Sequence, residues 1–188
     1  MAVINIDIDN TVNDFLDKFV MYFNGMQLSD KQITKEDFVH YNIAESTGIS
    51  NPILDALFFR NNHFHSTFLP LPNSIETITA LNDSGNCIRF VTSIHYDVIQ
   101  SRLDFIKEFF PFIDVNKQLI VTNDKKVIYA DVVIDDKESH ITGGNINPDC
   151  KFIVFDQPWN RKPVYKDDVR RAYDWNDVSS ILKEWNIL

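Results

Sequence analysis

The sequence predicts an α/β protein with a Rossmann-like parallel sheet, helices on both faces and a small helical cap inserted after the first strand. Short, almost continuously apolar segments are typical of strands that are buried on both faces of a sheet. Segments with helical spacing alternate with them, and this alternation favours a parallel sheet. The predicted strands are Val3–Ile8, Cys87–Thr92, Gln118–Val121, Val132–Ile134 and Phe152–Phe155.

Three helices are predicted between and after these strands. The first covers Ser74–Asn82, with Ser74 as a candidate cap and Gly85 as the stop signal. The second covers Asp97–Phe109 and ends before Pro111. The last covers Asn176–Trp185. Ligands of such folds bind beyond the carboxyl ends of the strands, so the functional side chains are expected there.

Residues 14–73 interrupt the alternation of strand and helix. Their aromatic and leucine residues recur at helical spacing, and no strand is predicted among them. We therefore expect a core of residues 1–13 and 74–188 and a helical cap of residues 14–73. The alternative is that these helices only cover the sheet. A lid is favoured because the segment leaves and re-enters the expected core beside an acidic turn.

Composition excludes several classes of function. The 188 residues carry a formal charge of −9, which argues against a general nucleic-acid-binding surface. No uninterrupted apolar stretch approaches the length of a membrane span, so no membrane partner is expected. Cys87 and Cys150 have no metal-like spacing and are interpreted as small buried hydrophobes, which favours a reducing, cytoplasmic location.

The end of the first predicted strand carries two carboxylates, Asp7 and Asp9. Residues two apart on a strand point the same way, so both can face one site. Hard cations take oxygen ligands, and two acids beside a turn suit a Mg²⁺ ion and a phosphate. A plain turn or a helix cap is the alternative interpretation.

Hydroxyls and lysines follow the next two strands. Thr92 and Ser93 can donate hydrogen bonds to a phosphate oxygen, and an N-cap is the alternative. Lys125 or Lys126, after the third strand, could neutralise a phosphate and a nucleophile together, although loop lysines are mostly solvated.

Adjacent acids, Asp135 and Asp136, follow the fourth predicted strand. Burial of two carboxylates there is costly unless they are paired or bind a metal.

The order acid-x-acid, hydroxyl, lysine, acid-acid resembles that of the haloacid dehalogenase-like phosphohydrolases over nearly the whole chain. Residues 122–137 are similar to the 5′(3′)-deoxyribonucleotidases, the cytosolic type C nucleotidase family. Residues 64–72, the helix that follows them, and Asn160-Arg161 are similar as well.

The resemblance implies a catalytic role for three residues. Asp7 would be the nucleophile that forms an aspartyl-phosphate. Asp9 would protonate the leaving oxygen and then activate water, and its backbone carbonyl would bind the metal. Lys125 would offset the charge around Asp7; it stands ten residues before the first acid of the pair, which selects it over Lys126.

The resemblance also implies a phosphate site and a Mg²⁺ site. Thr92 would hold the phosphoryl oxygens with Ser93 beside it. Asp136 would complete the Mg²⁺ shell together with Asp7 and Asp9, and Asp135 is the other candidate or an outer partner. Mg²⁺ would reduce the repulsion between a carboxylate and a phosphate dianion.

The expected substrate pocket departs from the family pattern. Phe64 and His65 stand where the family has aromatic residues against the base, so Phe64 is a candidate to stack on a pyrimidine or is a core residue. His63 and His65 are interpreted as surface residues rather than a metal pair. The family's arginine two before the lysine is Asn123 here. Arg161 is a candidate contact for phosphate or the acid pair.

Three further expectations concern the turn after Asp9, an arginine pair near the C-terminus and the oligomeric state. Asn10 replaces the usual Gly after the second acid, while Thr11 fits the wider superfamily pattern. Arg170-Arg171 is expected on a solvated face. The resemblance makes a homodimer one candidate assembly, because related enzymes are often dimers, and the sequence leaves the oligomeric state open.

The sequence thus predicts Mg²⁺-dependent hydrolysis of deoxyribonucleoside monophosphates, a small-molecule substrate class. One alternative keeps the chemistry but acts on a sugar phosphate or on a nucleic-acid 3′-phosphate end. The other is a non-catalytic phospholigand-binding module on the same scaffold.

Overall fold

A six-stranded parallel sheet in the order β3-β2-β1-β4-β5-β6 forms the centre of the computed structural model, which describes residues 1–165 and 169–188. The predicted α/β fold is confirmed. The strands are β1 (Val3–Ile6), β2 (Cys87–Thr92), β3 (Leu119–Val121), β4 (Val132–Asp135), β5 (Lys151–Phe155) and β6 (Val169–Ala172).

The first strand lies in the middle of the sheet, between β2 and β4. Ile4 pairs with Ile88 on one side and with Val132 on the other, and none of these three side chains is exposed. The ladder continues past the end of β1, because the Asp7 backbone N–H donates to the Ile134 carbonyl at 2.9 Å. The end of β1 is therefore fixed beside the end of β4.

Helices cover both faces of the sheet. Alternate residues of a strand point to opposite faces, and neighbouring strand residues accordingly belong to two separate apolar clusters. On one face, α5 (Ser74–Asp83) and α9 (Trp175–Glu184) pack together. On the other, α8 (Glu138–Thr142) packs against β4 and β5 through Ile141. The sheet is thus buried on both sides, as its continuously apolar strands predict.

Two more core helices follow β2. They are α6 (Ile99–Phe109), which follows a 3₁₀ turn over Tyr96–Val98, and α7 (Val115–Gln118), which packs against β2 and β3.

The N-terminal cap of α5 differs from the prediction. Its N-cap is Asn73 in the left-handed region, with φ 64°, and the Ser74 hydroxyl donates to the Leu71 carbonyl instead.

The sixth strand was not predicted, because its sequence contains two arginines rather than a continuous apolar run. It pairs in parallel with β5, so that Ala172 lies opposite Phe155. Arg170 is exposed and pairs with Glu184 at 3.0 Å, as expected for a solvated face. The same expectation is wrong for Arg171, whose guanidinium is largely buried and hydrogen-bonded to other side chains.

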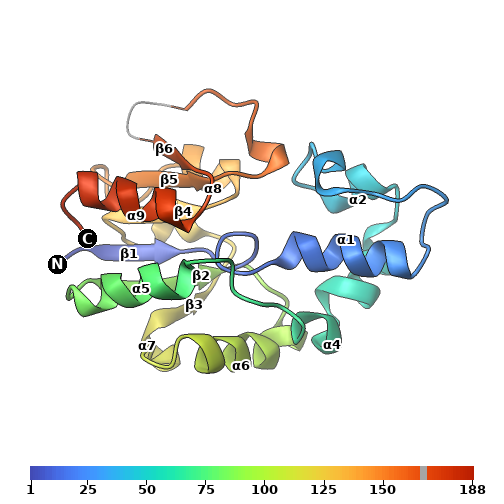
Figure 1. The fold of residues 1–188 in the computed structure, drawn as a ribbon, viewed down its shortest axis with the longest axis horizontal. Helices are drawn as coiled ribbons and strands as arrows, with labels where there is room; N and C mark the ends of the chain where they lie inside the picture. The colour runs from blue at the N-terminus through green and yellow to red at the C-terminus, as the bar shows by residue number, and fades with distance from the viewer. Residues whose placement is uncertain (166–168) are drawn as a thin grey trace.

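Residues 14–73, all of which the structure describes, form short helices and turns without a strand. We refer to them as the helical segment. It contains α1 (Phe15–Gly25), a 3₁₀ turn over Lys35–Asp37, α2 (Ile43–Thr47), α3 (Asn51–Leu54), a π-helical turn over Asp55–Phe59, and α4 (Asn62–His65). Figure 1 shows α1, α2 and α4 beyond the carboxyl ends of the strands, on the side of the molecule opposite the two termini.

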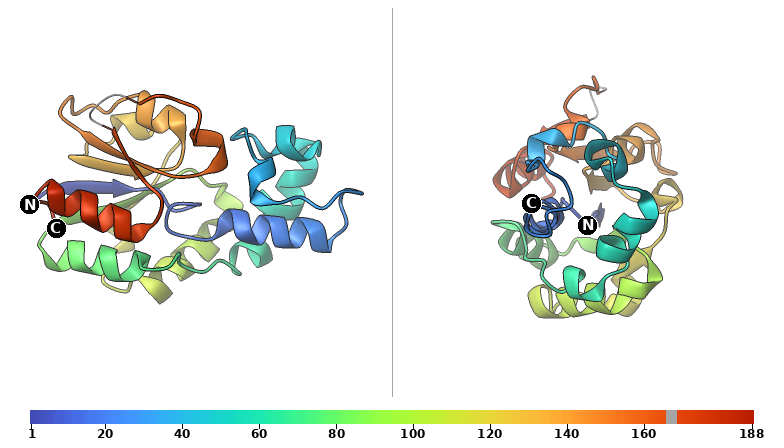
Figure 2. Two further views of the ribbon diagram at one scale, coloured as in Figure 1. Left: turned by 45° about the horizontal axis from the view of Figure 1, so that its top comes forward. Right: turned by 90° about the vertical axis from the view of Figure 1, so that its right-hand side faces the viewer.

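The helical segment has its own aromatic core. The Phe19 ring is fully buried and lies 4.5 Å from the Phe58 ring and 5.7 Å from those of Phe23 and Phe38, measured between centroids. Aromatic rings bury large areas and gain from edge-to-face and tilted packing. The segment therefore has a packed aromatic interior, which is continuous with the apolar cluster on one face of the sheet. The left view of Figure 2 shows the segment at the end of the molecule opposite the two termini.

The two connections between the helical segment and the sheet run side by side. The Asp14 N–H donates to the Leu69 carbonyl at 3.1 Å, and the Leu69 N–H donates back to the Asp14 carboxylate at 2.8 Å. The Leu71 N–H donates to the Val12 carbonyl at 2.7 Å. The segment thus leaves and re-enters the core at one place, directly after the turn that carries Asp9.

Truncating Phe19 tests the aromatic core. We expect Phe19→Ala to lower the free energy of unfolding by about 3–5 kcal/mol, because a buried ring leaves a cavity that the neighbours only partly fill. Met21→Ala on the same helix is the control, since Met21 is 56% exposed, and it should change stability by less than about 0.5 kcal/mol. Equal losses for the two variants in urea unfolding would contradict the assigned packing.

Candidate active site

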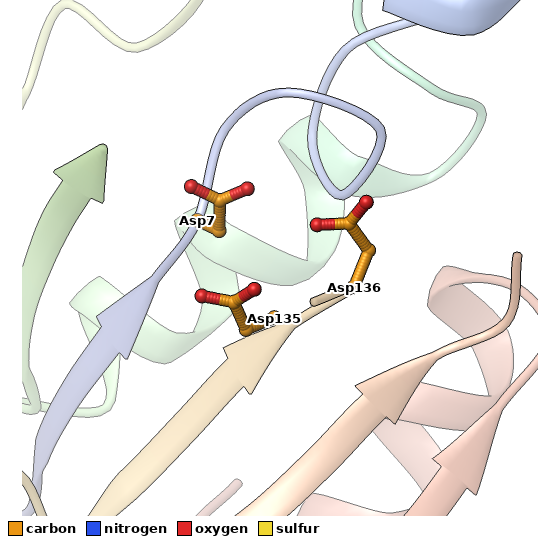
Figure 3. A group of neighbouring side chains, drawn as sticks. All are labelled: Asp7, Asp135 and Asp136. Carbon is orange, nitrogen blue, oxygen red and sulfur yellow. The ribbon is translucent and has the colours of Figure 1, made fainter. Parts of the chain in front are cut away.

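Three carboxylates from two neighbouring strands meet at the carboxyl edge of the sheet. Asp7 directly follows β1, and Asp135 and Asp136 stand at the end of β4. Each offers an oxygen within 4.8 Å of the others, and all three residues are buried. Figure 3 shows the three side chains turned toward one another. The prediction that the first acid and the tandem acids share one place in the fold agrees with this geometry.

A buried lysine bridges two of these carboxylates. Lys125 belongs to a 3₁₀ turn over Lys125–Val127, after β3, and only 8% of it is exposed. Its Nζ lies 2.5 Å from Asp7 Oδ1 and 2.8 Å from Asp135 Oδ2. Lys126 is exposed. The structure therefore brings Lys125, and not Lys126, to the acidic cluster.

The three acids are not equivalent electrostatically. Burial raises the pKa of Asp7 to about 6, although Lys125 opposes the shift. Burial also raises the pKa of Asp135, but Lys125 and His140 outweigh it and lower that pKa to about 2. The pKa of Asp136 is raised well above its ordinary value, by burial and then by the charges of Asp7 and Asp135. Asp136 is thus the carboxylate without a compensating cation.

The hydrogen bonds explain why Asp135 and Asp136 differ. Asp135 accepts from Lys125, from the Lys137 backbone N–H at 2.8 Å, and contacts His140 Nδ1 at 3.0 Å. Asp136 Oδ2 is buried and finds no hydrogen-bond partner among the described residues. A buried unpaired carboxylate oxygen is costly. A hard divalent cation that takes oxygen ligands fits this oxygen together with Asp7.

The backbone around Asp136 is held in place. Its carbonyl accepts hydrogen bonds from Asn160 Nδ2 at 2.8 Å and from Trp159 Nε1 at 3.1 Å. Asn160 is fully buried and also donates to the Phe155 carbonyl at 2.8 Å. The segment after β5 therefore fixes the direction in which the Asp136 side chain leaves the sheet.

The two hydroxyls at the end of β2 differ in their contacts. Thr92 is buried, and its Oγ1 lacks a hydrogen-bond partner in the part of the chain that the structure describes. Ser93 is exposed, and its hydroxyl donates to the Thr122 carbonyl at 2.7 Å. Thr92 is therefore the hydroxyl that remains available to an anion, whereas Ser93 ties the β2 and β3 loops together.

Asp9 lies outside the three-carboxylate cluster. Both of its carboxylate oxygens contact Arg102 Nη2, at 2.6 and 2.7 Å, and Oδ1 also accepts from Asn13 Nδ2 at 2.9 Å. Burial raises the pKa of Asp9, but Arg102, His65 and the Asn13 hydrogen bond together outweigh burial, and the pKa falls below its ordinary value. The turn that follows is tight, since Asn10 adopts a left-handed conformation with φ 61°.

A cavity of about 370 Å³ opens between the helical segment and the strand ends. Its size lies within the range of small-ligand sites, which are mostly apolar with a few polar groups. The lining residues are Asp9, Asn10, Phe15, Leu16, Tyr41, Asn42, Ile43, Phe59, His65, Ser93, Ile94, His95 and Trp159. The cavity wall thus contains Asp9, an acid of the predicted site, together with apolar and aromatic side chains.

The four residues expected in the substrate pocket are dispersed. His65 lines the cavity and is buried in α4, unlike the surface loop residue that the sequence suggested. Phe64 is 1% exposed and packs edge-to-face on Phe15 and Phe58, so it is a core residue of the helical segment. Asn123 is exposed and absent from the cavity wall.

Arg161, the fourth of these residues, lines a second cavity of about 460 Å³. It pairs there with Asp156 at 2.9 Å and with Glu36 of the helical segment at 2.7 Å. It contacts neither the three carboxylates nor the first cavity. The structure therefore gives no support to Arg161 as a contact of the acid pair.

Several residues of the site were not singled out from the sequence. They are Arg102 and His140, which bind the acids, and the cavity aromatic Tyr41. Arg102 carries a usable signal: it lies four residues after Val98 and four before Ile106, within the apolar face of its helix. A cation in such a face needs a buried partner.

Comparison with solved structures defines the class of protein. A haloacid dehalogenase family hydrolase from Deinococcus radiodurans R1, solved with bound phosphate and sodium, matches with a TM-score of 0.66 and 12% identity, covering 99% of this chain and 96% of its own. A putative hydrolase of the same type from Bacillus subtilis, bound to magnesium, matches with a TM-score of 0.59, 14% identity and coverage of 96% and 97%. The fold is that of the haloacid dehalogenase-like hydrolases.

Sequence comparison gives the family. The model of the 5′ nucleotidase, deoxy (pyrimidine), cytosolic type C protein family matches residues 1–185, and the chain belongs to this family. The 5′(3′)-deoxyribonucleotidase of Bacillus subtilis is 26% identical over 185 residues, 96% of this chain and 98% of that protein. The human mitochondrial 5′(3′)-deoxyribonucleotidase is 24% identical over 179 residues, 92% and 78% of the two chains.

Membership of this family makes the chain a phosphomonoesterase of the 5′-nucleotidase type, as the motifs predict. Across residues 1–165 and 169–188, no helix has the length and apolar character needed to cross a bilayer.

Removing the unpaired carboxylate tests the cation site. We expect Asp136→Asn to weaken Mg²⁺ binding by at least about tenfold, because the substitution removes an anionic oxygen from the cluster. Asp149→Asn removes an exposed acid and serves as the matched control with unchanged affinity. Isothermal titration of the two variants measures the difference, and equal affinities would contradict the assignment.

The raised pKa of Asp7 predicts that Mg²⁺ binding depends on pH. Mg²⁺ needs the ionised carboxylate, and below about pH 6 protons compete for it. The affinity should therefore rise between pH 5 and pH 7, by up to about tenfold per pH unit for each ligand that is still protonated. Asp136, whose pKa is also raised, adds to this dependence. Titrations in matched ionic strength check this, and a flat profile over that range would refute it.

Proposed function

We propose that this protein is a Mg²⁺-dependent 5′(3′)-deoxyribonucleotidase that hydrolyses deoxyribonucleoside monophosphates through an aspartyl-phosphate on Asp7. The observation that carries the proposal is the buried Asp7–Asp135–Asp136 cluster with Lys125 bonded to Asp7. The names of the relatives support the substrate class. We also propose a cytoplasmic location, which rests on the sequence argument alone.

The first step places the substrate phosphate over Asp7. The Thr92 hydroxyl, which has no other partner among the described residues, donates to a phosphoryl oxygen. Asp7 attacks phosphorus in line, and the bond from phosphorus to the nucleoside oxygen breaks. Asp9 gives that oxygen a proton, which it must take up before this step although Arg102 lowers its pKa. Asp9 is suited to this role because it lies on the cavity wall, whereas Asp7 does not.

The second step releases phosphate. Water attacks the phosphorus of the aspartyl-phosphate, Asp9 takes the proton from the water, and the bond from phosphorus to the Asp7 oxygen breaks. Lys125 donates to Asp7 throughout, so it offsets the negative charge that returns to this carboxylate. The Asp9 carboxylate is restored to the acid form by the proton that it accepts.

The cation site would be formed by Asp7 and Asp136, with the Asp9 backbone carbonyl and with Asp135 as an outer partner bound to Lys125. When bound, Mg²⁺ supplies charge stabilisation to the phosphoryl oxygens. The buried, unpaired Asp136 oxygen supports this assignment.

The nucleoside would occupy the cavity, and the helical segment would act as the cap over it. Tyr41 of the helical segment and Trp159 after β5 pack edge-to-face, with ring centroids 5.8 Å apart. Phe15 and Phe59 contribute further apolar surface. Aromatic side chains stack on flat bases. This pair is a better candidate for the base contact than Phe64, which is buried among other rings.

Replacing the nucleophile tests the chemistry. Asp7→Asn should abolish phosphate release from deoxyribonucleoside monophosphates, a loss of at least about 10³-fold, while the circular dichroism spectrum stays that of the wild type. Asp131→Asn is the control, since Asp131 contacts the start of β1, not the site. Wild-type turnover by Asp7→Asn would show that another group is the nucleophile.

Substrate choice needs a separate measurement. Initial rates across deoxy- and ribonucleoside monophosphates, a sugar phosphate and an oligonucleotide with a 3′-phosphate end should be highest for the deoxyribonucleotides, and a chelator should suppress them. Preference for the sugar phosphate or the oligonucleotide would contradict the substrate class. Binding of these compounds without any phosphate release would instead indicate a non-catalytic module.

A further inference from the structure

A buried arginine that the reaction scheme has not used contacts the proposed acid–base residue. Arg102 lies in α6, and its side chain is 2% exposed. Its Nη2 is 2.6 Å from Asp9 Oδ1 and 2.7 Å from Asp9 Oδ2. Asp9 is the one acidic group within ion-pair distance of this guanidinium in the described part of the chain. The contact joins residues that are 93 positions apart.

The arginine is not explained by the packing of α6. A buried guanidinium is costly unless its donors are satisfied. Yet Arg102 Nε is buried and has no hydrogen-bond partner within residues 1–165 and 169–188. The hydrogen bonds that this side chain makes both go to Asp9.

The Asp9 carboxylate is held from two directions. Asn13 Nδ2 donates to Oδ1 from within the same turn, at 2.9 Å. The Asn13 side chain is itself fixed, because its Oδ1 accepts from the backbone N–H groups of Asn10 and Phe15. Arg102 approaches from α6, the helix that follows the Thr92 strand end. The carboxylate is therefore fixed on the cavity wall.

We propose that Arg102 is a positioning residue that holds the Asp9 carboxyl group where the leaving oxygen of the phosphomonoester arrives. The inference rests on the proposed function, since it needs Asp9 as the acid–base group. Arg102 acts through Asp9 and touches neither phosphorus nor the leaving group. The effect of Arg102 on kcat/KM should therefore be larger for a leaving group that must be protonated than for one that leaves as a stable anion.

The test compares two substrates that differ in this need. The alkoxide of thymidine 5′-monophosphate must be protonated as it leaves, whereas the nitrophenolate of p-nitrophenyl phosphate is a stable anion. kcat/KM is the correct parameter, because it covers the steps up to the first irreversible one and omits hydrolysis of the phosphoenzyme. Arg102→Met should lower kcat/KM about 100-fold for the nucleotide and less than about threefold for p-nitrophenyl phosphate.

Two further variants separate positioning from folding. Arg102→Lys keeps a cation near Asp9 and should recover part of the nucleotide activity. Asp9→Asn should show the same dependence on the leaving group, and adding Arg102→Met to it should cost little more, because the two residues act as one unit. Arg171→Met is the structural control: it removes another largely buried arginine, paired with Asp156, and any loss should be equal for the two substrates.

The outcomes distinguish this inference from the proposed function. If the wild type is active and Arg102→Met lowers kcat/KM equally for both substrates, or adds its full effect to Asp9→Asn, Arg102 does not position Asp9 and the inference is wrong. A wild-type protein that hydrolyses neither substrate would overturn the proposed function and this inference together. Melting temperatures of all variants confirm that folded proteins are compared.

Discussion

The burial of negative charge at the end of two neighbouring strands is the constraint on which the rest of this structure depends. Asp7, Asp135 and Asp136 lie within reach of one ion, and each is at least nine-tenths buried. Carboxylates so close together repel one another strongly in a medium of low polarity. Lys125 compensates Asp7 and Asp135 directly and leaves Asp136 without a partner in the described chain. The same imbalance makes the cluster suitable for a divalent cation and a phosphate.

The fold supplies this arrangement through the topology of the sheet. Parallel strands end at one edge, so acids that directly follow β1 and β4 are neighbours by topology. The remaining groups come from loops whose backbones are tied down, as Asn160 ties the Asp136 carbonyl. The helical segment lies beyond this edge and supplies much of the apolar cavity wall. Chemistry and shape are thus contributed by different parts of the chain.

Sequence reasoning predicted the sheet and the acidic cluster because both depend on local patterns. Apolar runs give buried strands, and Asp7 and Asp136 stand directly after strand ends. Lys125 lies in the turn that follows β3. It failed where the outcome depends on three-dimensional packing. The β6 strand has no continuous apolar signal, and Phe64 could not be told from a pocket residue until its neighbours were known.

The two cations of the site, Lys125 and Arg102, differ in how far the sequence could identify them. Lys125 was selected because it stands ten residues before Asp135 in the sequence. In the structure, the turn after β3 places its side chain against Asp7 and Asp135. Arg102 lies in the middle of a helix, and only the packing of α6 against the strand ends brings it to Asp9. Its position in an apolar helix face was visible in the sequence, but its partner was not.

The central claim is that Asp7, held by Lys125 among the buried acids, is the group that receives the phosphoryl group. Rapid acid quench during turnover of a deoxyribonucleoside monophosphate, followed by peptide mass spectrometry, measures this directly. The account predicts a phosphoryl group on Asp7 and none on Asp9, Asp135 or Asp136. Steady turnover with no protein-bound phosphoryl group, or with one on another residue, would contradict it.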